Sequence, residues 1–162
     1  MKSIRRELAL KIGVGSLVVL VIGGAALFFS LREALVNQFD DVLKAKAAAL
    51  VLASEWERDE LELDLDILSF AGFGSGSRGD YFVVLGVDGL ELVRSPSLEA
   101  EALKIPERLA GVSEGFSNLA LPEDVSGRAF WATYEPIFAG EASKESRPPQ
   151  LTILVASADA IL

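Results

Sequence analysis

The chain has 162 residues, a formal net charge of −9, and neither histidine nor cysteine. The missing residue types exclude thiol nucleophiles, disulfide scaffolds, histidine–metal sites and Ser-His-Asp catalysis. The acidic balance argues against nucleic-acid binding, which needs a basic surface. The hydrophobic fraction of 51% is high for an acidic protein, so apolar residues must be concentrated somewhere.

The first concentration lies between Ile12 and Leu31, a stretch of 20 residues without a charge. As a helix it would span about 30 Å, the thickness of a bilayer's hydrocarbon core. Residues 1–11 carry four basic residues and one acidic residue, a net +3, which leaves −12 on the rest. Because basic flanks stay in the cytoplasm, we expect a cytoplasmic tail (1–11), a transmembrane helix (12–31), and an exported, periplasmic or extracellular domain (32–162).

A cleaved signal peptide is the alternative reading of this segment. The apolar core of a signal peptide usually has about 7–15 residues and is followed by small residues at the cleavage site. Here the run is longer, and the small residues Gly24 and Ala26 lie inside it, before Leu27. We therefore favour an uncleaved anchor.

The transmembrane helix is predicted to continue into a long helix over residues 32–55, which runs directly out of the membrane. Apolar residues recur on one face at helical spacing, at Leu35, Phe39, Leu43, Ala47 and Leu50. Such a helix can cover a sheet, and it can also transmit motion from the exported domain to the anchor.

The next segment, residues 55–66, holds seven acidic residues and one basic residue. A block of this kind is typical of a solvated face or loop. The alternative is a divalent-cation site, with Glu57, Glu60 and Asp64 as candidate ligands, because clustered carboxylates suit hard cations. The loop that follows contains Arg78-Gly79-Asp80, an integrin-type tripeptide by letter, with no other feature that supports adhesion.

Strand patterns dominate the remainder of the chain. Residues 81–86 and 90–94 are predicted to form a hairpin around Asp88-Gly89. After a loop with a short helix, further strands are expected at 116–121, 127–138 and 150–157, and the last is apolar on both faces and therefore central. Residues 157–160 look like the start of another helix. The predicted fold class is α+β, with a long helix packed on a mostly antiparallel sheet of about five strands.

The order of these features resembles a known group of receptors. The resemblance is carried by the anchor, the long helix, the strand that begins Asp80-Tyr81-Phe82, the Asp88-Gly89 turn, Arg94-Ser95, Ser97-Leu98, Gly127-Arg128 and the final LTILVAS strand. It is similar to the N-terminal region of bacterial two-component sensor histidine kinases with one periplasmic PDC-like (PAS-like) sensor, of the type that senses quorum signals or tricarboxylates.

The resemblance implies a homodimeric signal-input region in the bacterial inner membrane that ends before a second transmembrane helix. A kinase core would follow, would use ATP and Mg²⁺, and would phosphorylate a cytoplasmic response regulator. The present chain has no histidine to serve as phosphoacceptor, so we expect no catalytic residue and no cofactor within it. The signal would be a small molecule or a state of the cell envelope.

The candidate ligand residues are Arg94, Arg128, Tyr81 and Tyr134, and the alternation of side chains along a strand is expected to place Arg128 and Tyr134 on one face. An arginine can hold a carboxylate through two parallel hydrogen bonds, which makes the two arginines candidates for an anionic ligand. The competing interpretation is that each arginine pairs with one of the chain's 24 acidic residues.

Two other functions remain open. The chain could be a membrane-tethered periplasmic adaptor that binds a partner and transmits nothing. Alternatively, the same sensor could control a chemoreceptor or a cyclic-dinucleotide enzyme. The gene sequence downstream of residue 162 distinguishes these possibilities.

Overall fold

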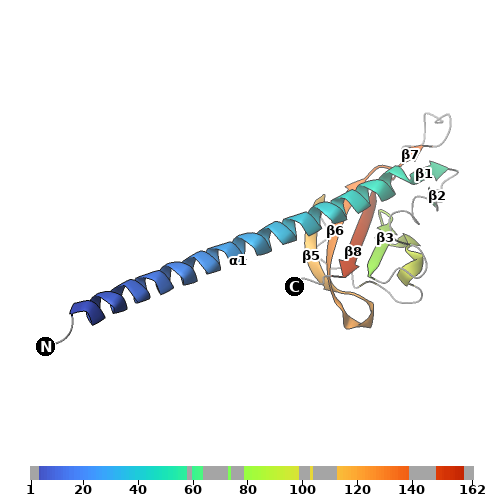
Figure 1. The fold of residues 1–162 in the computed structure, drawn as a ribbon. Coiled ribbons are helices and arrows are strands. Elements are labelled where there is room, and N and C mark those ends of the chain that lie inside the picture. The colour runs from blue at the N-terminus through green and yellow to red at the C-terminus, as the bar shows by residue number, and fades with distance from the viewer. Residues whose placement is uncertain are drawn as a thin grey trace. The chain divides into compact units, whose positions relative to one another are not determined.

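The computed structural model describes residues 4–57, 60–63, 73, 79–98, 103, 113–138 and 149–158. The chain divides into two compact units, Met1–Phe39 and Asp40–Leu162. One helix, α1 (Ile4–Leu52), runs from the first unit into the second (Figure 1).

The transmembrane helix continues without a break into the long helix, as the sequence predicts, and α1 ends at Leu52 instead of residue 55. The amide of Ala53 still donates to the carbonyl of Ala49 at 3.0 Å. The Ser54 hydroxyl then donates to the carbonyl of Val51 at 2.7 Å. This side chain satisfies one of the carbonyl groups that the last turn leaves without a helical partner, while its own backbone enters a strand.

In the N-terminal unit, α1 exposes its large apolar side chains. These include Leu17, Leu20, Ile22 and Phe28, each more than half exposed. The segment Leu10–Leu52 is long and apolar enough to contain a membrane span. A contiguous apolar surface of this kind is unusual on a water-soluble monomer, which agrees with the predicted anchor.

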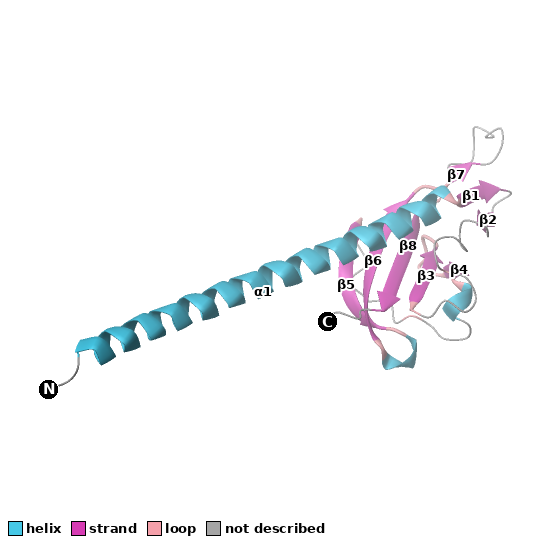
Figure 2. Ribbon diagram, in the orientation of Figure 1, coloured by secondary structure: helices cyan, strands magenta, loops and turns pink. Residues whose placement is uncertain are grey.

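The C-terminal unit is built on a five-stranded sheet in which every neighbouring pair is antiparallel (Figure 2). The strand order is β4-β3-β8-β6-β5, comprising β4 (Glu91–Arg94), β3 (Asp80–Leu85), β8 (Leu151–Ala158), β6 (Ser126–Tyr134) and β5 (Glu114–Ala120). One long helix with this sheet is an α+β arrangement and confirms the predicted fold class. The central position of β8 is confirmed as well.

The hairpin β3–β4 also forms as predicted. Its turn places Gly89 at a φ of 76°, which favours glycine. The Asp88 carboxylate accepts a hydrogen bond from the amide of Leu90 at 3.1 Å.

By contrast, the predicted helix start at Ser157 is wrong, because β8 continues through Ala158. The residues after Ala158 lie outside the described part of the chain.

A small second sheet has the order β2-β1-β7. Strand β1 (Ser54–Glu57) pairs antiparallel with β2 (Glu60–Leu63) and parallel with β7 (Ile137–Phe138). The acidic block was expected to be a solvated face or loop; its first part forms a β-hairpin on which Glu55 and Glu62 are exposed. The predicted strand 127–138 is two strands, because β6 ends at Tyr134 and β7 begins only after Pro136.

Two apolar layers enclose the five-stranded sheet. On one face, the last thirteen residues of α1 (Asp40–Leu52) bury Leu43, Ala47 and Leu50, which are at most 2% exposed. Burying each leucine contributes about 1.5–3 kcal/mol. The opposite face holds a separate cluster that includes Val83, Leu85, Leu98, Leu121, Trp131 and Leu154. The first of the short 3₁₀ turns, η1 (Pro96–Leu98), supplies Leu98, and Leu121 immediately precedes the other, η3 (Pro122–Asp124).

Candidate functional site

The charged residues on α1 that lie beside its buried stripe make specific contacts with the sheet. The Arg128 guanidinium, on β6, donates two hydrogen bonds to the Asp40 carboxylate, from Nε and Nη2, and the second measures 2.7 Å. Its Nη1 donates to Asn118 Oδ1 on β5 at 3.1 Å. The Arg128 and Asp40 side chains are only 19% and 16% exposed. This two-point ion pair therefore fixes both the position and the orientation of α1 on the sheet.

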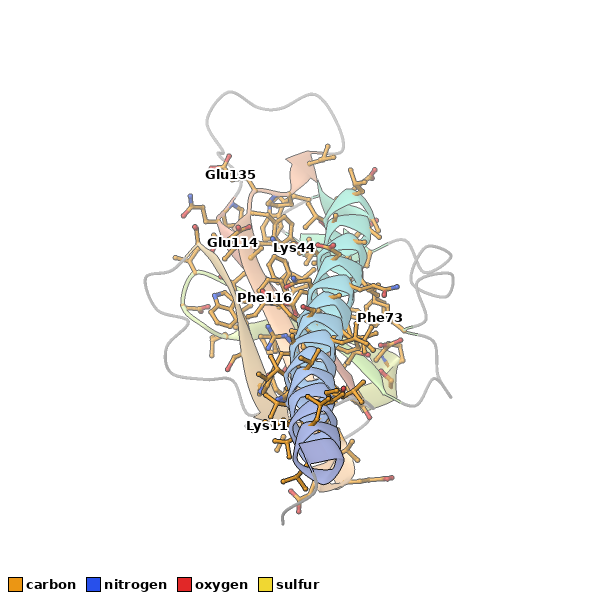
Figure 3. All side chains as sticks on the ribbon, turned by 60° about the vertical axis from the view of Figure 1, so that its left-hand side comes forward. Lys11, Lys44, Phe73, Glu114, Phe116 and Glu135 are labelled. Atoms are coloured by element: carbon orange, nitrogen blue, oxygen red, sulfur yellow. The ribbon has the colours of Figure 1, made fainter. Side chains whose placement is uncertain are left out.

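Aromatic rings reinforce the same contact. Phe116 on β5 and Phe130 on β6 lie with ring centroids 5.0 Å apart. Lys44 Nζ lies 5.4 Å from the Phe116 centroid (Figure 3). It lies 5.9 Å from the Phe130 centroid, and the Arg128 guanidinium carbon lies 5.3 Å from the Phe116 centroid. Each such cation–ring contact contributes about 0.5–1 kcal/mol at an exposed site. One aromatic pair thus holds a cation from the helix and a cation from the sheet.

A second polar contact lies on β3 and β8. The Asp80 carboxylate binds Lys46 Nζ at 2.6 Å and accepts a hydrogen bond from the Ser157 hydroxyl at 2.6 Å. Lys46 also lies 5.8 Å from the ring centroid of Phe73. The helix is therefore joined to both β3 and β6. Because the Asp80 carboxylate is engaged in this way, it is not displayed as an integrin-type tripeptide would require.

The four predicted ligand residues are not brought together. The alternation expected along residues 128–134 is confirmed, and it places Arg128 and Tyr134 on the face that α1 covers. Tyr81 packs against the apolar cluster on the opposite face, and Arg94 is the register partner of Val83, which belongs to that cluster. Arg94 forms an ion pair with Glu91, three residues before it on β4. Both arginines thus have acidic partners, as the competing interpretation of the sequence proposes.

Two polar groups are buried without a hydrogen-bond partner among the described residues: the Trp131 indole nitrogen and the Tyr134 hydroxyl. Burial raises the pKa of the Tyr134 hydroxyl above its ordinary value of 10.0, and the nearby Ser54 hydroxyl offsets part of the shift. The contact with Ser54 does not have full hydrogen-bond geometry. The Trp131 ring lies against Gly115, where an added Cβ would be 2.6 Å from the ring.

The acidic block shows no cation site in the described part of the chain. Glu57 and Glu60 are register partners at the end of the β1–β2 hairpin. Asp64, the third predicted ligand, lies outside the described residues. Across the ranges that the structure describes, no three or more acidic side chains are grouped to hold a metal ion.

Sequence reasoning missed the importance of Asp40, Lys46 and Asp80. In the sequence, Asp40 and Lys46 lie off the apolar stripe predicted for this helix. The spacing did contain an indication. Asp40 and Lys46 are each three residues from the buried Leu43, so they are its neighbours on the helix surface and border the stripe. Charged residues at such border positions are placed to reach partners on the covered sheet.

No family model, curated protein or solved structure matches the chain. Functional inference therefore depends on the fold and on these contacts.

Proposed function

We propose that the chain is the extracytoplasmic signal-input region of a membrane-bound bacterial two-component sensor histidine kinase, with a PDC-like (PAS-like) sensor domain. One observation supports this most strongly. The same helix, α1, contains an exposed apolar stretch suited to a bilayer and, in its last thirteen residues, two ion-paired contacts with the sheet. In this proposal, residues 1–11 are cytoplasmic and the sheet lies outside the inner membrane.

The proposed mechanism is a displacement of α1 that follows a change in the sheet. Asp40 and Lys46 join the helix to β6 and β3, so a relative shift of these strands would pull on the helix at two points. A helix hydrogen-bonded along its whole length carries such a displacement along its axis. A ligand changes the balance of two states only through its different affinity for them, and each tenfold difference corresponds to about 1.4 kcal/mol.

An anionic small molecule is the proposed class of signal. Arg128 is held by Asp40 and Asn118, so a ligand there would have to displace two partners. Arg94 and Tyr81 lie on the face of the sheet that α1 does not cover, and a carboxylate at Arg94 would compete with Glu91. We therefore place the ligand on the face of Tyr81 and Arg94.

The partners in this proposal are the membrane, a second copy of the chain, and a response regulator reached through a downstream kinase core that binds ATP and Mg²⁺. The test is the gene sequence beyond codon 162. The proposal predicts a second apolar run of about 20 residues, followed by a histidine-kinase core whose autophosphorylation can be measured in membranes. A stop codon at that point would overturn it in favour of a tethered adaptor. A chemoreceptor or cyclic-dinucleotide domain there would assign a different output.

A further inference from the structure

The side of α1 that faces away from the sheet carries an apolar stripe. Within the C-terminal unit it presents four residues, which we call the outer stripe: Val42, Ala45, Ala49 and Leu52. Val42 is 46% exposed and Leu52 is 71% exposed. The buried stripe of Leu43, Ala47 and Leu50 lies on the other side of the same turns. A helix that is apolar on two sides needs cover on both, and the sheet covers only one.

The spacing of the outer stripe is that of a coiled-coil seam. Its four residues are separated by steps of three, four and three, which are the a and d positions of a heptad. In the sequence of the N-terminal unit, the same steps continue backwards through Gln38, Leu35, Leu31 and Phe28. Gln38 is the one polar residue in this series, and a single polar residue at a core position fixes the register of paired helices.

The charges beside the outer stripe favour a parallel pair. Asp41 and Lys46 border it on opposite sides, at the g and e positions. In a parallel pair, Asp41 of one copy faces Lys46 of the other, whereas an antiparallel pair would bring like charges together. Lys46 can take part while it keeps its contact with Asp80, because an ammonium group has three donors.

We propose that the outer stripe is the surface on which a second copy of this chain packs, with α1 against α1 in parallel. Two copies anchored by α1 share one orientation and one membrane plane, which raises their effective concentration. Ala45 and Ala49 allow the two helices to approach closely, and Val42 and Leu52 supply the larger contacts. This inference rests on the proposed membrane anchoring, and it identifies the partner surface of the proposed homodimer.

Disulfide cross-linking tests the interface directly, since the natural chain has no cysteine. Single variants V42C and A49C are oxidised in native membranes that contain the full chain. The matched control is V87C, on the exposed β3–β4 turn, where the natural side chain is 77% exposed. We expect roughly tenfold more covalent dimer for the two stripe variants than for the control. An added Ala45→Glu substitution should reduce that dimer several-fold.

Equal cross-linking of all three variants would show random collision, and an absence of dimer at V42C and A49C would show that the stripe is not the interface. Either result overturns the inference. Membrane fractionation of the same samples separates it from the proposed function. A membrane-bound chain without a stripe cross-link refutes only the interface, whereas a cross-linked chain whose gene lacks a kinase core refutes only the proposed output.

Discussion

The ion pair between Asp40 and Arg128 can be dismantled one partner at a time. Asp40→Asn keeps the shape of the side chain but removes its charge. Hydrogen bonds to charged groups contribute about 1.5–3 kcal/mol, and because the pair is 16–19% exposed, solvent screening reduces the expected loss to about 1–2 kcal/mol. Arg128→Ala also removes the hydrogen bond to Asn118 and the contact with Phe116, so we expect it to lower the free energy of unfolding by about 2–3 kcal/mol.

The double variant should lower the free energy of unfolding by about 1 kcal/mol less than the sum of the two single variants, because each single variant already breaks the shared contact. The assay is denaturant unfolding of the full chain in detergent micelles, followed by tryptophan fluorescence. Both tryptophans, Trp56 and Trp131, lie in the C-terminal unit, so the fluorescence reports on that unit. Glu114→Gln, an exposed carboxylate on the same face of the sheet, is the control and should change stability by less than about 0.5 kcal/mol.

The reasoning would be refuted if the effects of D40N and R128A were simply additive. It would also be refuted if the control variant cost as much as D40N. Either result would mean that the two side chains do not stabilise the helix–sheet contact through each other.

Three other predictions follow from the same structure. Tyr134→Phe should leave stability at pH 7 within about 0.5 kcal/mol, because the hydroxyl has no hydrogen-bond partner among the described residues. The pKa of the Tyr134 hydroxyl is raised in the folded state, so it contributes stability that is fully present below pH 10.0 and is lost as the pH rises above that value, because the unfolded state ionises first. The alkaline loss of stability of Y134F should therefore be smaller than that of the natural chain. Identical alkaline unfolding curves would contradict the raised pKa of Tyr134. Gly115→Ala should cost about 1–3 kcal/mol, because its Cβ would overlap the Trp131 ring, and unchanged stability and Trp fluorescence would show that the ring is not held there. Small carboxylates should raise the melting temperature through Arg94, so Arg94→Ala should abolish the shift; a shift that instead depends on Arg128 would move the ligand to the other face.

The sequence was informative wherever structure depends on local pattern. Residues 12–31, an uncharged run without proline, form part of α1 as predicted, and the β3–β4 turn forms where Gly89 permits a positive φ. The hairpin in the acidic block was missed because its charge density conceals short strands, in which Trp56 and Leu61 are register partners. That hairpin also gains a parallel partner, β7, from far along the chain.

The helix–sheet contacts were harder to predict for a different reason. Asp40 and Arg128 are separated by 88 residues, so no local spacing connects them. Their meeting depends on which strand occupies which place in the sheet, and that is a tertiary property. The alternation along β6 correctly placed Arg128 and Tyr134 on one face. It carried no information about Tyr81 and Arg94, whose strands had to be positioned in the sheet before their faces were known.

The central claim is that α1 anchors an exported sheet domain, and site-directed cysteine labelling measures this most directly. Ser3→Cys and Gln150→Cys are introduced singly into the cysteine-free chain and treated with a membrane-impermeant maleimide. Our account predicts that the chain is recovered in the membrane fraction, that the cysteine at position 150 reacts in cells whose inner membrane is intact, and that the cysteine at position 3 reacts only after that membrane is broken. Reaction of position 3 in intact cells, or a chain found only in the soluble fraction, would contradict it.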